Sequence, residues 1–421
     1  MRKVASEKAK VFPEVERVVT APTLTADGRA IDTPGYHADA QVIYRPDEKL
    51  TLRAMAVDEA KAVLDDLLYD FPFDSDASKA GAYALMLTPV VRAMVDGPTP
   101  NMQVEAPVQG SGKSLLAEVC LLPSFGRAAG TSLPTGTDET RKKLTAEFAR
   151  GAGYVWFDNV RGKFGNTALE QAVTGTEWSD RILGYTVTRT FPVRAVWVST
   201  VNNASATPDM RRRTYAIRIE PDMENPTLRK RSEFRHPYLK VWAHEHRAEL
   251  LSAVVAMARA WVDAGSPAFA GEPMGSFEEW SRVVGGILQH ADVPGFLDHD
   301  DDYFLDDTSR DERLEFFASW NLDIKVGSEQ WVLPADLVRS FGVRFPPDVY
   351  DDRAENVDRT ALNYYLRDNR GMVAGGFKLE RSPKRTAKGY RWRVRVLENR
   401  RAEAERARAE FERAEFEAVA S

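Results

Sequence analysis

EAPVQGSGKSLLAEV, residues 105–119, is the stretch that decides the fold class we expect for this chain. Loops that bind phosphate between a strand and a helix follow the pattern G-x-x-x-x-G-K-[ST]. Gly112, Lys113 and Ser114 match the end of this pattern, whereas Pro107 stands where the first glycine belongs. The fixed φ of proline can turn the chain out of the strand, and its missing N–H contributes little to the inner cradle. The stretch is either a working phosphate loop or a glycine-rich turn.

A phosphate loop needs backbone N–H groups that point inward through tight turns, and glycine permits such turns. Gly110 and Gly112 can supply them, and a helix that begins at Lys113 adds a dipole that favours an anion. Lys113 would then reach the β- and γ-phosphates of ATP, and Ser114 would hold Mg²⁺. The nucleotide-binding residues that we expect are Gly110, Ser111, Gly112, Lys113, Ser114 and Leu115.

Two later strands end in polar residues that suit the same site. Asp158 ends the apolar stretch YVWF, where a carboxylate can bind the water shell of Mg²⁺ or, alternatively, cap a turn. Asn202 or Asn203 ends the stretch AVWVSTV, where an amide can contact the γ-phosphate or the attacking water. We therefore expect Ser114 and Asp158 to hold the metal through water, and Asn202 to act with Lys113 in catalysis.

The stretch DMRRR, residues 209–213, places a run of arginines after the third of these strands. Arginine can stabilise transition-state charge on the nucleotide of a neighbouring subunit. Arg212 and Arg213 are the candidates, and a solvated charged surface is the alternative. An arginine in this role works only across a subunit boundary, so the run also predicts a homo-oligomer.

Strand and helix signals alternate through residues 101–221, which is typical of a parallel sheet flanked by helices. We therefore expect an α/β fold for this part of the chain. Apolar periodicity predicts further helices within residues 57–95, 236–265 and 276–291. Short hairpins with turns at Asp27-Gly28 and Pro34-Gly35 are expected in the first 56 residues.

The order GSGKS, YVWFDNV, ILGYTVTRTFPVRAVWVSTVNN and DMRRR resembles the P-loop cores of superfamily-3 helicases, above all the AAA+-like replication proteins of phages and plasmids. The resemblance covers residues 60–225 and implies ATP hydrolysis with Mg²⁺ by a ring of six subunits. It also implies a β-hairpin whose basic residues grip single-stranded DNA in the central channel. DRILGYTVTRTFPVR, residues 180–194, matches that segment, so Arg189 and Arg194 are its candidates.

One residue departs from the family pattern. Most AAA+ ATPases follow the Walker B aspartate with a glutamate that polarises water, and here Asn159 follows Asp158. An amide is no strong base, so Asn159 can only orient water, and phosphoryl transfer depends mostly on positioning and electrostatics. Glu105 and Glu177 are spare carboxylates that could take the missing role. The departure favours slow hydrolysis or a nucleotide-gated switch.

A second basic stretch, FKLERSPKRTAKGYRWRVRV, spans residues 377–396. Two β segments flank a turn rich in lysine and arginine, as in the wing of a winged helix, and residues 360–369 would be the recognition helix. Lys384, Arg385 and Lys388 are the candidates for contacts with duplex DNA phosphates. A subunit contact or a solvated strand edge is the alternative.

The complete expectation is an α/β P-loop NTPase core, AAA+ or superfamily-3 helicase-like, with helical flanks and a C-terminal winged-helix-like α+β domain. The expected parts are a β-rich extension (1–56), a helical segment (57–100), the ATPase core (101–225), a helical lid or linker (226–300), the winged-helix-like domain (301–397) and a charged helix (398–421).

Composition bounds the setting in which the protein works. The chain has 421 residues, a net charge of −6 and one cysteine, so any nucleic-acid surface must be a local patch and no internal disulfide can form. No apolar run has the length of a signal peptide core or a membrane span. We expect a soluble cytoplasmic protein of a bacterial or phage-infected cell, with no membrane partner.

The function favoured by these features is an ATP hydrolase: a DNA helicase or translocase in phage or plasmid DNA replication. One alternative is a replication initiator or loader that binds ATP and DNA with little turnover. Another is an AAA+ scaffold ATPase in a phage-defence or packaging complex. No primase module is recognisable before residue 60, so priming would belong to a separate chain.

Overall fold

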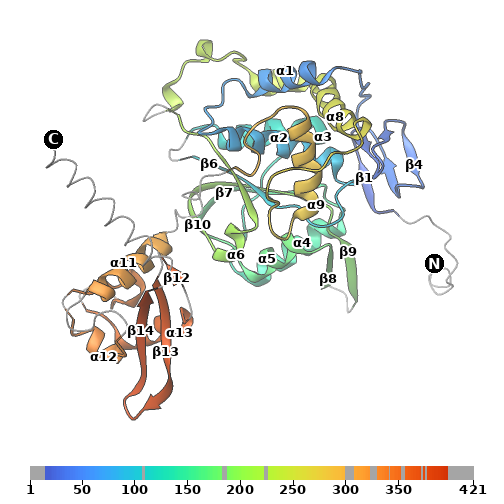
Figure 1. The fold of residues 1–421 in the computed structure, drawn as a ribbon. Coiled ribbons are helices and arrows are strands. Elements are labelled where there is room, and N and C mark those ends of the chain that lie inside the picture. The colour runs from blue at the N-terminus through green and yellow to red at the C-terminus, as the bar shows by residue number, and fades with distance from the viewer. Residues whose placement is uncertain are drawn as a thin grey trace, which may run out of the picture. The chain divides into compact units, whose positions relative to one another are not determined.

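The computed structural model divides the chain into two compact units, residues 1–299 and 300–421 (Figure 1). Pro107 and the charged segment 398–421 lie outside the described residues. The structure describes residues 15–106, 110–182, 187–221, 226–298, 308–322, 330–340, 342–351, 356–370, 373–374 and 377–396. Among these residues, no helix combines the length and the apolar character that crossing a membrane requires.

A four-stranded parallel sheet lies at the centre of the larger unit, in the order β11-β6-β10-β7 (Figure 1). Strand order differs from chain order, so the connections cross over the faces of the sheet. In this register Ser199 of β10 lies opposite Gln103 of β6 and Phe157 of β7. The expected α/β class with a parallel sheet is confirmed. The strands are β6 (Asn101–Glu105), β7 (Tyr154–Phe164), β10 (Val196–Ala206) and β11 (Thr214–Arg218).

Helices pack against the sheet and against one another. Helix α2 is buried along nearly its whole length, as expected for a helix without a polar face. Gly81 allows its close approach to β11, because a Cβ there would lie 2.5 Å from the ring of Tyr215. The helices of this unit are α1 (Val57–Leu68), α2 (Asp76–Val91), α3 (Lys113–Phe125), α4 (Thr137–Ala149), α5 (Thr167–Thr174), α6 (Pro208–Arg211), α7 (Leu239–Glu245), α8 (Arg247–Asp263), α9 (Glu278–Trp280) and α10 (Gly286–His290).

Two expected helices are interrupted. The segment 236–265 forms α7 and α8, which meet at His246. The backbone N–H of His246 donates to the carbonyl of Trp242 at 2.9 Å, and its ring stacks on the Trp242 ring with centroids 4.5 Å apart. The segment 276–291 contains a π-helical turn, Ser281–Gly285, between α9 and α10. Apolar periodicity alone did not reveal either interruption.

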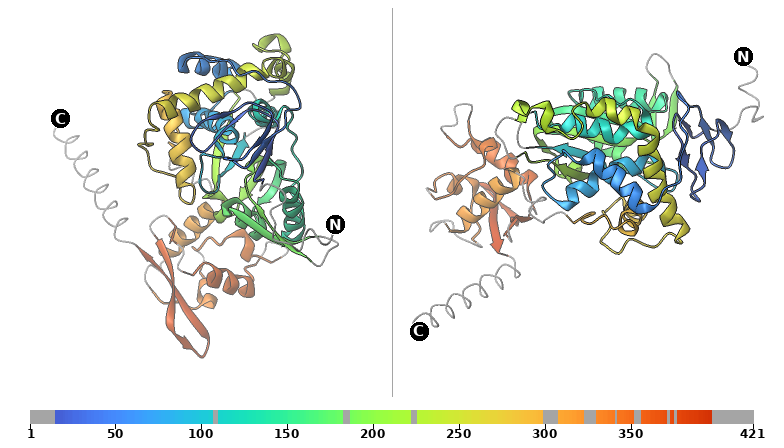
Figure 2. Two further views of the ribbon diagram at one scale, coloured as in Figure 1. Left: turned by 90° about the vertical axis from the view of Figure 1, so that its right-hand side faces the viewer. Right: turned by 90° about the horizontal axis from the view of Figure 1, so that it is seen from above.

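The N-terminal extension adds small sheets at one end of the larger unit (Figure 2). The expected turn at Asp27-Gly28 is confirmed, with Gly28 at φ 84° between antiparallel β2 and β3. Gly35 instead begins β4, which pairs with β5, so Pro34-Gly35 closes no hairpin with β3. Thr23 donates a hydrogen bond of 2.8 Å to the carbonyl of Val90 on α2. The strands are β1 (Arg17–Val19), β2 (Thr23–Leu24), β3 (Ala30–Ile31), β4 (Gly35–His37) and β5 (Val42–Tyr44).

The smaller unit is an α+β structure with its own apolar core. Phe316, Trp320 and Leu366 are fully buried in it, against Leu379 and Val394 of an antiparallel sheet. A bridge between Val332 and Trp392 adds a short edge to that sheet. The elements are α11 (Thr308–Leu322), α12 (Pro334–Leu337), α13 (Arg359–Asp368), β12 (Val373–Ala374), β13 (Phe377–Thr386) and β14 (Gly389–Val396).

Candidate functional site

Three strands of the central sheet bring polar residues to one edge. The glycine loop follows β6, Asp158 lies on β7, and Thr200 lies on β10. The register places Thr200 opposite Val104, so the strands reach this edge at the same level. Ligands of open parallel sheets bind at the carboxyl ends of the strands, which makes this edge the candidate site.

The glycine loop has a backbone that other residues avoid. Gly110 has φ 76°, and Gly112, directly before α3, has φ 92°. L-residues meet steric clashes at such φ values, so both positions favour glycine. Lys113 then begins α3, whose first N–H groups and dipole attract an anion. The described part of the loop therefore makes left-handed turns of the kind that glycine permits.

Lys113 is half-buried near two carboxylates. Burial lowers the pKa of Lys113, and the charges of Asp158 and Glu105 act in the opposite direction. Glu105 is itself held by Arg218, with 3.2 Å between Nε and Oε1, and by the Gln103 amide at 2.9 Å. An anion at the loop would add negative charge beside Lys113 and so favour its protonated form.

Ser114 and Asp158 are in direct contact, as a shared metal site requires. The hydroxyl of Ser114 donates to Oδ1 of Asp158 at 2.7 Å. Two oxygens at this spacing fit Mg²⁺, which usually takes one or two protein ligands and fills its shell with water and phosphate oxygens. Across the described residues, no cluster of three or more His, Cys, Asp or Glu side chains offers a richer metal site.

Thr200 holds this arrangement together, although the sequence analysis did not single it out. Its hydroxyl donates to Oδ1 of Asp158 at 2.5 Å and accepts from the backbone N–H of Asn159 at 2.8 Å. Thr200 is 1 % exposed, so its hydroxyl is buried, while Asp158 is half-buried and Asn159 is exposed. A hydroxyl near the end of the otherwise apolar stretch AVWVSTV was the available signal.

Asn159 adopts a left-handed backbone, with φ 54°. Asparagine tolerates this region better than most residues, which gives Asn159 a conformational role in addition to any chemical one. Its side chain is exposed, while its N–H is fixed by Thr200. Gly130 passes close by, because a Cβ on it would lie 2.3 Å from the Cβ of Asp158.

The other candidate residues of the active centre, Glu105, Glu177 and Asn202, lie on three different strands. Glu105 ends β6 at the loop, whereas Glu177 begins β8, where it lies opposite Pro192 on a hairpin. Asn202 lies on β10 two positions beyond Thr200, and its side chain is outside the described part of the structure. Of the two spare carboxylates, Glu105 is the one placed beside Lys113.

A cavity of about 760 Å³ adjoins the glycine loop. Four of the six predicted nucleotide-binding residues line one side of this cavity: Gly110, Ser111, Gly112 and Leu115. Its other walls are mostly apolar or aromatic and come from the connection between α1 and α2, from Pro221 and from residues 226–241: Phe71, Pro72, Pro221, Phe234, Pro237 and Tyr238. Such a lining beside a phosphate loop suits a flat, weakly polar group such as a nucleobase.

The predicted arginine run lies at the opposite edge of the sheet. The N–H of Asn101, the first residue of β6, donates to the carbonyl of Arg213 at 2.9 Å. Five residues of β6 separate this edge from the loop, roughly 16 Å at the usual rise per residue. Arg212 is 57 % exposed and bonds to Asp209, whereas Arg213 is only 13 % exposed. Neither is near the loop of its own chain, and Arg212 is the one whose guanidinium is accessible.

The predicted hairpin is present, but it holds only one of its two candidate residues. Strands β8 (Glu177–Arg181) and β9 (Thr188–Pro192) pair antiparallel, and Arg189 is exposed opposite Asp180 (Figure 1). Arg194 lies beyond β9 and forms an ion pair of 3.4 Å with Glu16 of the N-terminal extension. Arg194 therefore does not belong to the hairpin surface.

The C-terminal hairpin sorts its basic residues into two groups. Arg393 and Arg395 bond to Glu380; burial alone would raise the pKa of Glu380, but these bonds lower it. Lys384, Arg385 and Lys388 are exposed near the turn, with no ion pair to a described residue. The uncompensated charge is thus concentrated at the tip.

Two solved structures of JCV helicase are similar to part of this chain. One, with a small acetamide compound bound, has 15 % identity and a TM-score of 0.22 over 46 % of this chain and 67 % of that chain. The other has 14 % identity and a TM-score of 0.24 over 56 % of this chain and 66 % of that chain. No model of a known protein family and no curated protein matches the sequence. At these TM-scores the likeness carries no weight for function, which depends on the residues of the site.

Replacing Thr200 with valine should weaken Mg²⁺ binding at the nucleotide site. Valine keeps the shape but leaves Asp158 without its buried donor and the Asn159 N–H without an acceptor. Loss of such a supporting bond typically costs about 10- to 100-fold in metal affinity. We would measure the Mg²⁺ dependence of binding of a non-hydrolysable ATP analogue.

The matched control is Thr200→Ser, which keeps the hydroxyl and should bind as the parent does. Thermal melting of both variants separates misfolding from loss of the site. A valine variant that folds and retains the parental Mg²⁺ dependence would show that Thr200 has no positioning role.

Proposed function

We propose that this protein binds ATP with Mg²⁺ at the carboxyl edge of its parallel sheet and hydrolyses it to move along DNA, as a helicase or translocase of phage or plasmid replication. The observation that carries the proposal is the meeting of Lys113, Ser114 and Asp158, which come from segments far apart in the chain, beside the cavity next to the loop.

The residues present fit the nucleotide and its metal. The glycine loop and the first turn of α3 would hold the phosphates, and Lys113 would balance their charge. Ser114 and Asp158 would hold Mg²⁺, with Thr200 fixing the carboxylate. The apolar cavity would hold the base between residues such as Phe71 and Tyr238. ATP bound there supplies a phosphoryl group that water can accept.

Water activation is the weak part of this site. Asn159 offers an amide rather than a carboxylate, and Glu105 is tied to Arg218 and Gln103. This observation favours a second candidate function: a nucleotide-gated replication initiator or loader that binds ATP and DNA but turns over slowly. Both functions use the same nucleotide site, and the rate of hydrolysis distinguishes them.

The position of Arg212 supports assembly into a ring. It lies at the sheet edge opposite the loop, so it can complete only the nucleotide site of a neighbouring chain. A closed ring satisfies this for every subunit, because each chain then gives one arginine and receives one. Six subunits is the number implied by the family resemblance.

Two separate surfaces are available for DNA. The β8–β9 hairpin carries exposed Arg189 and would face a single strand in the channel. The smaller unit has the order α11, a bridge at Val332, α12, α13, the short strand β12 and the β13–β14 hairpin, which supports a winged-helix assignment. Its exposed tip residues Lys384, Arg385 and Lys388 would contact duplex phosphates.

Lys113→Ala should abolish ATP binding at the glycine loop, since the cation next to the phosphates is lost. Lys142→Ala is the matched control, because Lys142 is an exposed lysine of α4 that pairs with Glu139. Binding of a fluorescent ATP analogue measures both variants. Parental affinity in the Lys113→Ala variant would remove the basis of the proposal.

The same variant tests assembly. Chains with Lys113→Ala and chains with Arg212→Ala should each be inactive alone, and mixing them should restore part of the ATPase activity. An interface that joins an intact Lys113 from one chain to an intact Arg212 from the next is then complete. No recovery, together with a monomer in sedimentation with ATP and DNA, would contradict the ring.

Asn159→Glu should raise the hydrolysis rate if a general base is what the site lacks. A positioned base contributes typically 10²-fold or more, while glutamate at positive φ costs about 1–2 kcal/mol in folding. Asn159→Gly is the control, because glycine suits the backbone and adds no base. Steady-state ATPase rates compare the three proteins. A slower glutamate variant would show that the amide itself is needed.

Neutralising Lys384, Arg385 and Lys388 should weaken duplex binding at all sequences and flatten its salt dependence by about one unit of slope per lost phosphate contact. Arg395→Ala is the control, since Glu380 already compensates Arg395.

Arg189→Ala should leave duplex binding intact but reduce DNA-stimulated hydrolysis. Fluorescence anisotropy at several salt concentrations and ATPase assays with single-stranded DNA test the two surfaces separately.

A further inference from the structure

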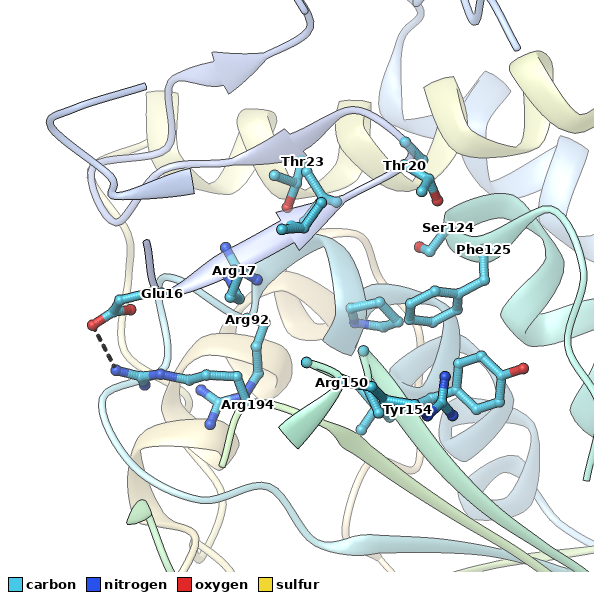
Figure 3. A pocket seen from close by; sticks show the side chains of 18 of the residues that line it. Glu16, Arg17, Thr20, Thr23, Arg92, Ser124, Phe125, Arg150, Tyr154 and Arg194 are labelled. Carbon is cyan, nitrogen blue, oxygen red and sulfur yellow. Dashed lines mark hydrogen bonds and ion pairs between the residues drawn. The ribbon is translucent and has the colours of Figure 1, made fainter. Parts of the chain in front are cut away.

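A second cavity, of about 580 Å³, lies at the sheet edge opposite the glycine loop (Figure 3). Tyr154 and Val196, the first residues of β7 and β10, line it, and β1 of the N-terminal extension covers it. It therefore shares no lining residue with the cavity beside the loop. Nothing in the proposed ATPase cycle uses it.

Three arginines from separate segments converge on this cavity (Figure 3). Arg17 comes from β1, Arg92 directly follows α2, and Arg194 precedes β10. Glu16 is the ion-pair partner of Arg194, at 3.4 Å. Arg17 makes no ion pair or side-chain hydrogen bond with any described residue. Glu16 and Asp47 are the carboxylates that line the cavity, so the cluster carries more positive charge than they balance.

Burial and mutual repulsion act on the pKa values of two of these arginines. Burial and then repulsion from Arg194 lower the pKa of Arg17 to about 10. Burial, Arg194 and Arg17, in that order, lower the pKa of Arg92 to about 9. Both groups are still protonated at neutral pH, so the fold keeps these like charges together at a cost. Glu16 near both, and Asp96 near Arg92, offset part of it.

The three arginines differ in how many of their N–H groups are hydrogen-bonded within the protein. Arg92 is 2 % exposed and donates to the carbonyls of Val95, Gly97 and Val193, which is a structural role. Nε of Arg92, Nη2 of Arg17 and Nε of Arg194 are also buried, and none of the three has a hydrogen-bond partner among the described residues. Buried N–H groups of this kind are costly unless a ligand accepts from them.

The other end of the cavity is aromatic. The rings of Phe125 and Tyr154 lie 4.9 Å apart at an angle of 59°, and Ser124 contributes a buried hydroxyl with no partner among the described residues. Arg150 also lines this end, paired with Glu147. An anionic group at one end and a flat or apolar group at the other would match this lining.

We infer that this cavity is a second ligand site, which takes the phosphate or diphosphate group of a small molecule between Arg17 and Arg194. Guanidinium groups bind phosphate oxygens through paired, charge-assisted hydrogen bonds. A bound dianion would satisfy the unpartnered N–H groups and remove the repulsion among the three arginines. It would also join the N-terminal extension to the core, because Arg17 and Arg194 lie on opposite walls of the site.

Calorimetric titration of the full chain carrying Lys113→Ala tests the site, with inorganic pyrophosphate and ADP as probes. Lys113→Ala removes the phosphate loop as a competing binding site. If the loop binds no nucleotide and the proposed function is wrong, this substitution has no effect on the titration, and the test of the second cavity remains valid. Tighter binding of ADP would identify a nucleotide as the source of the phosphate, and equal binding would identify a free diphosphate; either supports the site.

Adding Arg17→Gln or Arg194→Gln should raise the dissociation constant of the bound probe about tenfold or more, as expected for a lost charge-assisted pair. Arg282→Gln is the control, because Arg282 is an exposed arginine paired with Glu279 and lies outside the cavity. The two variants lie on different segments, so one remains informative if the other fails to fold. Absence of binding in the Lys113→Ala parent, or unchanged affinity in the glutamine variants, would overturn the inference.

Discussion

The bond between Thr200 and Asp158 is the interaction on which the candidate site depends. Asp158 must point at Ser114 for the two oxygens to share a metal, and a half-buried carboxylate on a strand has several rotamers open to it. The buried hydroxyl of Thr200 selects one of them and at the same time fixes the backbone of Asn159. The parallel register of β7 and β10 makes this contact, so the chemistry rests on sheet geometry.

The two edges of the sheet present different electrostatic environments. At the carboxyl edge, the N-terminus of α3 and Lys113 provide positive potential that the carboxylates Asp158 and Glu105 moderate. At the amino edge, the positive potential comes from the side chains of Arg17, in the N-terminal extension, and Arg194, directly before β10. Both edges can hold anions, but only the first has the oxygen pair that a metal needs.

Asn159 illustrates how conformation and chemistry compete at one position. A glutamate would supply a base, but the left-handed backbone at φ 54° favours asparagine or glycine. The strand therefore keeps a residue that fits the turn, and Glu105 remains the spare carboxylate beside Lys113. A protein with this arrangement can bind a nucleotide well and still hydrolyse it slowly.

The sequence by itself determined the local features: the glycine loop and the helix at Lys113, the buried strands, and the basic C-terminal hairpin. Each of these is encoded within a short window by glycine, by apolar periodicity or by charge. Only the tertiary structure decided that Thr200 supports Asp158 and that Arg194 pairs with Glu16 instead of lying on the hairpin surface. It also decided that Arg17 and Arg92 line the same cavity as Arg194. The physical reason is that these contacts depend on the tertiary arrangement, which places side by side segments that are between 42 and 178 residues apart and leaves no trace in local spacing.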